Sequence, residues 1–235
     1  MKKFLVDDEV FEVFPNYCVG VVIANGIDNS KPLDSLGDLL QNEIDKFTQE
    51  NTDNNVRELR YVNLYREAFR KLNINPNKYM CSIESLLKRT QKNKKLPVIN
   101  PVVDLGNFFS IKYQLPLGAH DIDKLVDNLE IRFTNQDDRF LPMGETEIEI
   151  PDSGEFVYVS GNTVKTRRWM WRQSDDGKIT EESSNIFFPI DGFIDENEKD
   201  VIKLRDELSE FIRKAYNCEV RVGFVDKNNR SFIIE

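Results

Sequence analysis

Histidine is almost absent from this sequence of 235 residues, in which His120 is the only one. The cysteines Cys18, Cys81 and Cys218 are odd in number and widely spaced, and no CxxC pair occurs. This pattern excludes a disulfide framework and gives no recognisable zinc site. A Cys–His nucleophile is also poorly supported, because no cysteine has a histidine near it in the sequence. We therefore expect reduced thiols and no bound metal.

Long apolar runs and the common phosphate-binding motifs are missing as well. The longest apolar stretches, such as YCVGVVIA, are far shorter than the roughly 20 residues of a membrane helix. The N-terminal MKKFLVDDEV lacks the apolar region of a signal peptide. Neither GxGxxG, GxxxxGK[ST] nor GxSxG occurs. We expect a cytoplasmic protein with no membrane partner and no cofactor.

The net charge is −9, which argues against a protein that coats nucleic acid through bulk charge. The charge is uneven, however. The segment Arg57–Lys95 carries eleven basic and three acidic side chains, a net charge of +8 that leaves −17 for the remainder. A basic island of this kind is typical of a local phosphate-binding face, although a solvated helical surface would show the same pattern.

The hydrophobic pattern predicts helices early in the chain and strands later. Helices are expected over 35–47, 57–72, 82–92 and 101–113, and over 196–217. Strands are expected over 10–14, 17–24, 129–133, 139–143, 146–150, 155–160, 162–173 and 185–190, with a terminal hairpin of 219–225 and 231–234. Residues 1–235 are therefore predicted to form a single α+β domain with clustered helices and an antiparallel sheet.

Two stretches combine polar side chains in a way that could form a site. In DLGNFFSIKYQLPLGAHD, residues 104–121, Asp104, Asn107 and Ser110 share one face of the expected helix, as a pocket wall or as a structural network. His120 and Asp121 follow the helix break and are weak catalytic candidates.

The second stretch is TRRWMWRQ, residues 166–173, interpreted as a strand. In that conformation Arg168 and Arg172 lie on one side, and Trp169 and Trp171 on the other. The tryptophans would either stack a base or an aromatic ligand, or form a core face covered by the arginine stems.

Several motifs resemble a known family. SIESLLKR, LPVINPVVDLGNFFSIKYQLPLGAHDIDKL, GEFVYVSGNTVKTRRWMWRQ and ITEESSNIFFPIDG are similar to free-standing proteins built from the tRNA-editing domain of the bacterial phenylalanyl-tRNA synthetase β subunit, the B-three/B-four domain. The resemblance runs from about residue 60 to 217. It implies an α+β fold with a layered β/β/α core. It also implies hydrolysis of the ester bond that joins a wrong amino acid to tRNA. In the synthetase that amino acid is tyrosine.

The site residues of that family match only in part. Asn107 stands where the family has an asparagine in the helix, but Gly118 occupies the histidine position and His120 an aromatic position. Pro189 stands where the family has the glutamate that recognises the tyrosine hydroxyl, and the nearest acid is Asp191. Ester hydrolysis is compatible with these differences, whereas they weaken the expectation of tyrosine specificity.

The resemblance implies an aminoacyl-tRNA deacylase that acts in trans on a released aminoacyl-tRNA, with no aminoacylation activity. The predicted substrate-binding residues are Asn107, Ser110, Gly118, Ala119, Arg168, Trp171 and Arg172. The predicted contacts to tRNA phosphates are Arg66, Arg70, Lys88, Arg89 and Lys92. Two alternatives stay open, a non-catalytic module that binds an amino-acid-like small molecule and an RNA-binding protein without hydrolysis.

Overall fold

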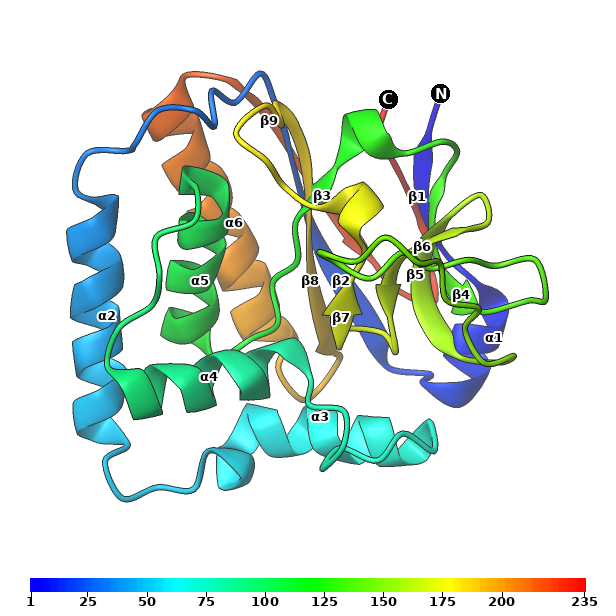
Figure 1. Cartoon of the computed structure of the whole chain (residues 1–235), viewed down its shortest axis with the longest axis horizontal. Coiled ribbons are helices and arrows are strands. Elements are labelled where there is room, and N and C mark those ends of the chain that lie inside the picture. Colours follow the sequence, from blue (N-terminus) through cyan, green and yellow to red (C-terminus); the bar gives the residue numbers. More distant parts are fainter.

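Two β-sheets and a group of helices make up the computed structural model, which describes residues 1–235 (Figure 1). The larger sheet has the strand order β10-β1-β4-β5-β6-β7. Its strands are β1 (Lys3–Val6), β4 (Leu129–Phe133), β5 (Phe156–Ser160), β6 (Thr163–Arg167), β7 (Arg172–Gln173) and β10 (Ser231–Ile233). The smaller sheet has the order β3-β8-β2-β9. Its strands are β2 (Tyr17–Asn25), β3 (His120–Asp121), β8 (Asn185–Phe193) and β9 (Glu219–Val225).

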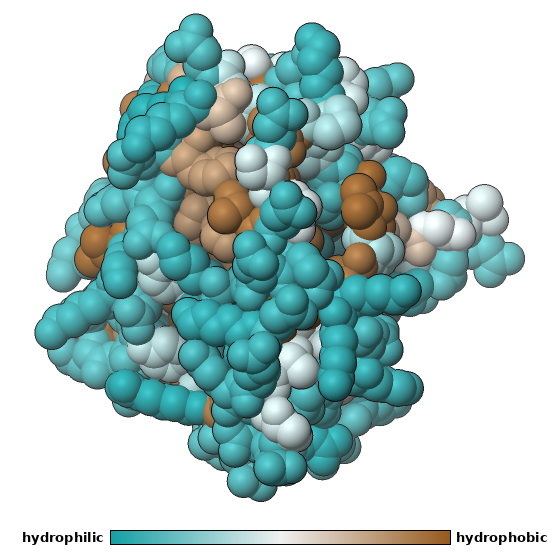
Figure 2. Space-filling view, turned by 90° about the vertical axis from the view of Figure 1, so that its left-hand side faces the viewer, coloured by the Kyte–Doolittle hydropathy of each residue, from teal (hydrophilic) through white to brown (hydrophobic).

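The helices gather on one side of the sheets, on the left in Figure 1. They are α2 (Leu36–Glu50), α3 (Arg60–Lys71), α4 (Ser82–Asn93), α5 (Pro101–Tyr113) and α6 (Glu198–Tyr216), with the short α1 (Asp8–Val13) apart from them beside β4. Three 3₁₀ turns lie at Val56–Glu58, Ile122–Lys124 and Asp175–Gly177. The outer face of the helices is mostly hydrophilic, with apolar side chains confined to small patches (Figure 2), as amphipathic helices packed on a core require.

The smaller sheet is the middle layer of the fold. Strand β2, the β-branched run YCVGVVIAN, is buried along almost its whole length and pairs with β8 and β9. Helix α6 packs against one face of this sheet. On the other face, Phe187 of β8 meets Phe4 of β1 with ring centroids 4.9 Å apart. The order is thus sheet, sheet, helices, and the predicted α+β fold with a β/β/α core is confirmed.

Some predicted elements are different in the structure. Residues 10–14 were expected as a strand, but Asp8–Val13 is helix α1, because the Asp7 carboxylate accepts from the Glu9 N–H at 2.9 Å and caps the first turn. The stretches 139–143 and 146–150 form no strands and share only one isolated bridge, between Phe140 and Glu149.

The predicted terminal hairpin is also wrong. Both of its strands exist, but β9 pairs with β2 in the smaller sheet, whereas β10 pairs with β1 in the larger one. The turn at Asp226–Asn229 therefore carries the chain from one sheet to the other. In addition, the larger sheet is mixed rather than purely antiparallel, because β1 and β4 run parallel.

Candidate functional site

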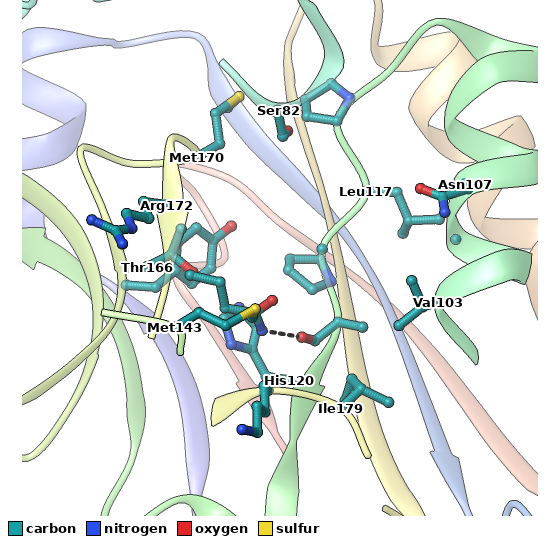
Figure 3. Close-up of a pocket in the computed structure, with 18 of the residues that line it drawn as sticks. Ser82, Val103, Asn107, Leu117, His120, Met143, Thr166, Met170, Arg172 and Ile179 are labelled. Carbon is teal, nitrogen blue, oxygen red and sulfur yellow. Dashed lines mark hydrogen bonds between the residues drawn. The ribbon is translucent and has the colours of Figure 1, made fainter. Parts of the chain in front are cut away.

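A cavity of about 560 Å³ opens between helix α5 and the β6–β7 end of the larger sheet. Val103 and Asn107 of α5 form one wall, Thr166 and Arg172 lie on the opposite wall, and His120 lies between them (Figure 3). The lining is mostly apolar with a few polar groups, which is the usual character of a small-molecule site. The cavity therefore gathers residues from both halves of the chain.

The start of helix α5 is fixed by a cap, which sets the residues that the helix presents to the cavity. Asn100 caps it, with its side-chain oxygen accepting from the Val103 N–H at 3.0 Å. Val103, Gly106 and Asn107 then follow at helical spacing and all border the cavity. Asn107 is half-buried, and its amide makes no hydrogen bond within the protein. Ser110, predicted beside it, is buried one turn further on and does not border the cavity.

The loop after α5 contributes mainly backbone. Gln114 ends the helix in a left-handed conformation with φ of 53°. The chain then follows β8, where the Gly118 N–H donates to the Pro189 carbonyl at 2.9 Å. The Ala119 carbonyl accepts from Gln173 Nε2 at 2.8 Å. Gly118 and Ala119, both predicted substrate contacts, thus border the cavity on a loop that is tied down on two sides.

His120 borders the cavity but is only 2% exposed. Its ring stacks on Tyr158 with centroids 5.3 Å apart, and its Nδ1 is buried with no hydrogen-bond partner. Burial, with a smaller contribution from the charge of Lys165, lowers the pKa of His120 to about 3. The imidazole is therefore neutral near pH 7 and a weak proton acceptor.

Asp121, the other weak catalytic candidate, does not border the cavity. Its carboxylate accepts from the Ser183 hydroxyl at 2.7 Å and from the Asp123 N–H at 3.0 Å. Both bonds anchor the chain around β3 rather than a ligand. The consecutive residues His120 and Asp121 therefore point to different surroundings, as neighbours in a strand must.

A second carboxylate, Asp191 on β8, does border the cavity. Its Oδ1 accepts hydrogen bonds from Tyr17 and, at 2.8 Å each, from Tyr158 and from Trp169 Nε1. Tyr65 donates to its backbone carbonyl at 2.6 Å. Burial raises the pKa of Asp191 above its ordinary value. Sequence reasoning noted this residue only as an acid near Pro189 and missed its three donors, which no local pattern pairs with it.

The predicted strand over 166–173 is wrong. Strand β6 ends at Arg167, and Arg168 and Trp169 both have left-handed backbone, with φ of 47° and 62°. The chain turns there and returns as β7, which pairs with β6. Trp169 is consequently a fully buried core residue that donates to Asp191, and the expected face with two tryptophans does not exist.

Arg168 and Trp171 form a stack at the edge of this turn. The Arg168 guanidinium lies 4.0 Å from the Tyr79 ring centroid and 4.9 Å from that of Trp171, and it pairs with Glu155 at 3.3 Å. Trp171 borders the cavity, whereas Arg168 does not. Arg168 therefore braces the wall from behind, since its charge and its planar face are already occupied.

The predicted phosphate contacts differ in whether their side chains already form ion pairs within the protein. Arg66 is 5% exposed and pairs at 2.7 Å with the fully buried Glu84, which also binds Lys88 at 2.6 Å. Arg70 pairs with Glu67 on the same helix at 2.5 Å. The Arg66–Glu84–Lys88 cluster joins α3 to α4, because a buried carboxylate needs such partners. Arg66 and Lys88 of the basic island thus compensate a buried acid.

Arg89 and Lys92, on the exposed side of α4, form no ion pair. Arg89 also borders the cavity. Arg172 borders it as well, but its guanidinium is paired with Glu145 at 2.6 Å. Among the predicted basic residues, Arg89 therefore combines a free charge with a position at the cavity. The roles of all these residues remain predictions.

The thiols and acids offer no metal site. Cys18 and Cys81 are buried, and burial raises the pKa of the Cys81 thiol to about 12, which leaves it unreactive. No group of three or more histidine, cysteine, aspartate or glutamate side chains is arranged to hold a metal ion. None of the helices has both the length and the apolar character needed to cross a lipid bilayer.

Comparison with known proteins gives the family. The chain is 30% identical over 142 residues to the phenylalanine–tRNA ligase beta subunit of Fusobacterium nucleatum, covering 57% of this chain and 16% of that subunit. It is 37% identical over 57 residues to the same subunit of Coxiella burnetii, covering 24% of this chain and 7% of that subunit. The matched segments are therefore a small part of those subunits.

A crystal structure of an N-terminal fragment of the phenylalanyl-tRNA synthetase beta subunit from Pyrococcus horikoshii aligns with a TM-score of 0.47 and 11% identity, covering 93% of this chain and 50% of that one. The family model of the B3/4 (B-three/B-four) domain matches residues 64–220. This match includes every residue that lines the cavity, among them those of α5, of the loop after it and of β8. Because it covers more than half of the chain, the protein belongs to the B3/4 domain family.

Proposed function

We propose that this protein is an aminoacyl-tRNA deacylase that acts in trans and hydrolyses the ester of a mischarged tRNA. The observation that carries the proposal is the cavity of about 560 Å³ within the B3/4 region, with the free amide of Asn107 on its wall and the unpaired Arg89 at its edge. The resemblance to ligase beta subunits connects this cavity to tRNA. An editing site must be separate from the site of synthesis, because binding alone discriminates poorly between similar side chains.

The chemistry that such a site must supply is modest. A water oxygen attacks the ester carbonyl, the bond to the ribose oxygen breaks, and the water proton ends on that oxygen. Orientation of the reactants supplies on the order of 7–11 kcal/mol in the best cases. A single well-placed oxyanion donor adds about 3–4 kcal/mol. The Asn107 amide is available as that donor, since no group of the protein occupies it.

A histidine base is not part of this mechanism. The pKa of His120, lowered to about 3 by burial, makes its imidazole a poor acceptor for the water proton. We assign His120 to the wall, where its neutral ring hydrogen-bonds or packs against the bound ester. The neighbouring ribose hydroxyl of the substrate can assist the proton transfer instead.

Transfer RNA would enter past α4. Arg89 and Lys92 lie about one helical turn apart on the exposed side of this helix, and both charges are unpaired. Contacts of this kind to phosphates supply affinity that falls steeply with salt. The paired Arg66 and Lys88 would brace the helix rather than contact the RNA.

The experiment is the incubation of purified protein with a panel of correctly charged and mischarged tRNAs. Deacylation of at least one mischarged tRNA faster than in buffer supports the proposal, and no deacylation across the panel overturns it. A second candidate function is a binding module for an amino-acid-like molecule. The absence of side-chain chemistry at Gly118 and Pro189 favours it, and thermal stabilisation by free amino acids without any effect on tRNA would support it.

A further inference from the structure

Asp191 borders the cavity and is only 3% exposed. Pro189 precedes it by two residues on β8, so both side chains lie on the same face of the strand, toward the cavity. The other acid near this part of the chain is Asp121. Asp121 accepts from Ser183 and lies outside the cavity, so it cannot bind a ligand there.

The two carboxylate oxygens of Asp191 have unequal surroundings. All three side-chain donors, which are Tyr17, Tyr158 and Trp169, reach the same atom, Oδ1. Oδ2 accepts no hydrogen bond from another side chain. Because Asp191 borders the cavity and its Oδ1 is already used by three donors, Oδ2 is the oxygen left to bind a ligand there.

The charge of this carboxylate has no cationic partner. No lysine, arginine or histidine forms an ion pair with Asp191, and only neutral donors stabilise its ionised form. A buried carboxylate is normally paired, because the loss of hydration is costly. The rings of Tyr158 and Trp169 also border the cavity, and aromatic faces attract cations. The part of the cavity around Asp191 is thus suited to a cation that comes with the ligand.

We propose that Asp191 Oδ2 binds a primary ammonium group of the ligand, namely the α-ammonium of the aminoacyl moiety. The identity of the ligand as an aminoacyl ester rests on the proposed function, whereas the charge recognition does not. Every aminoacyl-tRNA carries this ammonium group, so Asp191 orients the ester for any side chain. Selectivity among side chains then depends on the apolar walls, including Val103 and Ile179 (Figure 3).

The test measures binding of amide analogues that cannot be hydrolysed, by calorimetry at neutral pH. The probes are 3′-deoxyadenosines that carry an alanylamino or a phenylalanylamino group at the 3′ position. Each is compared with its N-acetyl form and with the acid-derived analogue that lacks the amino group. The wild-type protein is expected to bind at least one ammonium-bearing probe about tenfold or more tightly than its two uncharged counterparts.

The variant Asp191→Asn keeps an acceptor for the three donors and removes the charge. It is expected to lose the preference for the ammonium while its affinity for the uncharged analogues stays the same. The matched control is Pro189→Ala, which alters the same face of β8 and should keep the preference. Equal binding of charged and uncharged probes to the wild-type protein would overturn the proposal, and so would retention of the preference in Asp191→Asn or the absence of binding by all probes.

The wild-type comparison stands even where the Asp191→Asn protein does not fold, which circular dichroism would report. The outcome is also separable from that of the deacylation assay. An ammonium preference that depends on Asp191, in a protein that hydrolyses no mischarged tRNA, would refute the proposed function and leave the role of Asp191 in place.

Discussion

Gly118 and Pro189 fit against each other. The Gly118 N–H donates to the Pro189 carbonyl at 2.9 Å, and a Cβ atom on Gly118 would lie 3.0 Å from Pro189 Cγ. The resemblance predicts that Gly118 and Pro189 occupy the histidine and glutamate positions of the synthetase editing motif, and in the structure these two residues form one contact. Along β8, His120 pairs with Phe187 two residues before Pro189, and Asp191 follows two residues after Pro189. Polar groups thus flank a small apolar surface.

This contact predicts a coupled pair of substitutions. Gly118→Ala should lower the free energy of unfolding by about 1 kcal/mol, because the new methyl group meets the proline ring. In a Pro189→Ala background, which lacks the ring atom, the same change should cost clearly less. Urea unfolding of the four proteins measures this coupling. Equal costs in both backgrounds would show that the two residues are independent.

The single histidine allows a direct measurement of its pKa. Since burial lowers the pKa of His120 to about 3, its ring-proton resonance should not titrate between pH 8 and pH 5 in the folded protein. Because the chain holds no other histidine, the imidazole signal in the NMR spectrum needs no assignment by mutagenesis. A midpoint near 6.5 would contradict the buried, neutral imidazole.

The same shift predicts how stability changes with pH. The unfolded chain takes up a proton at His120 below about pH 6.5, whereas the folded protein does not until about pH 3. The neutral ring therefore contributes its full share to the free energy of unfolding above pH 6.5. This contribution is lost as the pH falls, and the loss is about 2 kcal/mol at pH 5. The difference in unfolding free energy between wild type and His120→Gln should shrink by this amount from pH 7.5 to pH 5. A constant difference would refute the assignment.

Removal of the acceptor at Asp191 should be costly. Asp191→Ala leaves the Tyr17 and Tyr158 hydroxyls and the Trp169 N–H without their partner. We expect a loss of about 3 kcal/mol in the free energy of unfolding. Asp191→Asn, which retains an acceptor oxygen, should lose much less. If both variants are equally destabilised in chemical denaturation, the charge rather than the hydrogen bonding stabilises this part of the core.

Arg89 and Arg66 should respond in opposite ways to truncation. Arg89→Ala is expected to weaken tRNA binding at unchanged stability and to reduce the slope of log K against log salt by about 0.9. Arg66→Ala should instead destabilise the fold by about 3 kcal/mol or more, because it leaves Glu84 buried with weaker compensation. Filter binding across a salt series and urea unfolding separate the two effects.

Arg70→Ala is the surface control for the stability measurement, since its ion pair with Glu67 is exposed on both sides. It should change stability little. A loss of tRNA affinity in Arg66→Ala protein that remains folded, with none in Arg89→Ala, would reverse the assignment.

The regular elements were largely predictable from hydrophobic periodicity. Strand β2 and helices α5 and α6 carry long, unambiguous patterns, and the Asn100–Pro101 start of α5 is encoded locally. The reversal at Arg168 and Trp169 was not predictable, because residues of these types seldom adopt left-handed backbone and no glycine signals the turn. Its cause is tertiary, since Trp169 fills the core and donates to Asp191.

The cavity was predictable in its α5 wall and less so elsewhere. Asn107 and Gly118 follow from the local motif, but Tyr17 lies 174 residues from the carboxylate it binds. No single-sequence pattern relates positions so far apart. For the same reason the pairing of Arg66 with Glu84 was missed, and two members of the basic island were expected to contact RNA although they neutralise a buried acid.

The most direct test of the account uses a mischarged tRNA that the wild-type protein deacylates. Its rate of deacylation is compared among wild-type, Asn107→Ala and Ser110→Ala protein. Ser110, one turn along α5 and away from the cavity, is the matched control. Asn107→Ala should lower the single-turnover rate constant about 100-fold with little change in stability, and Ser110→Ala should leave the rate constant unchanged. Equal rates for wild type and Asn107→Ala, or no hydrolysis of any mischarged tRNA by the wild type, would contradict the account.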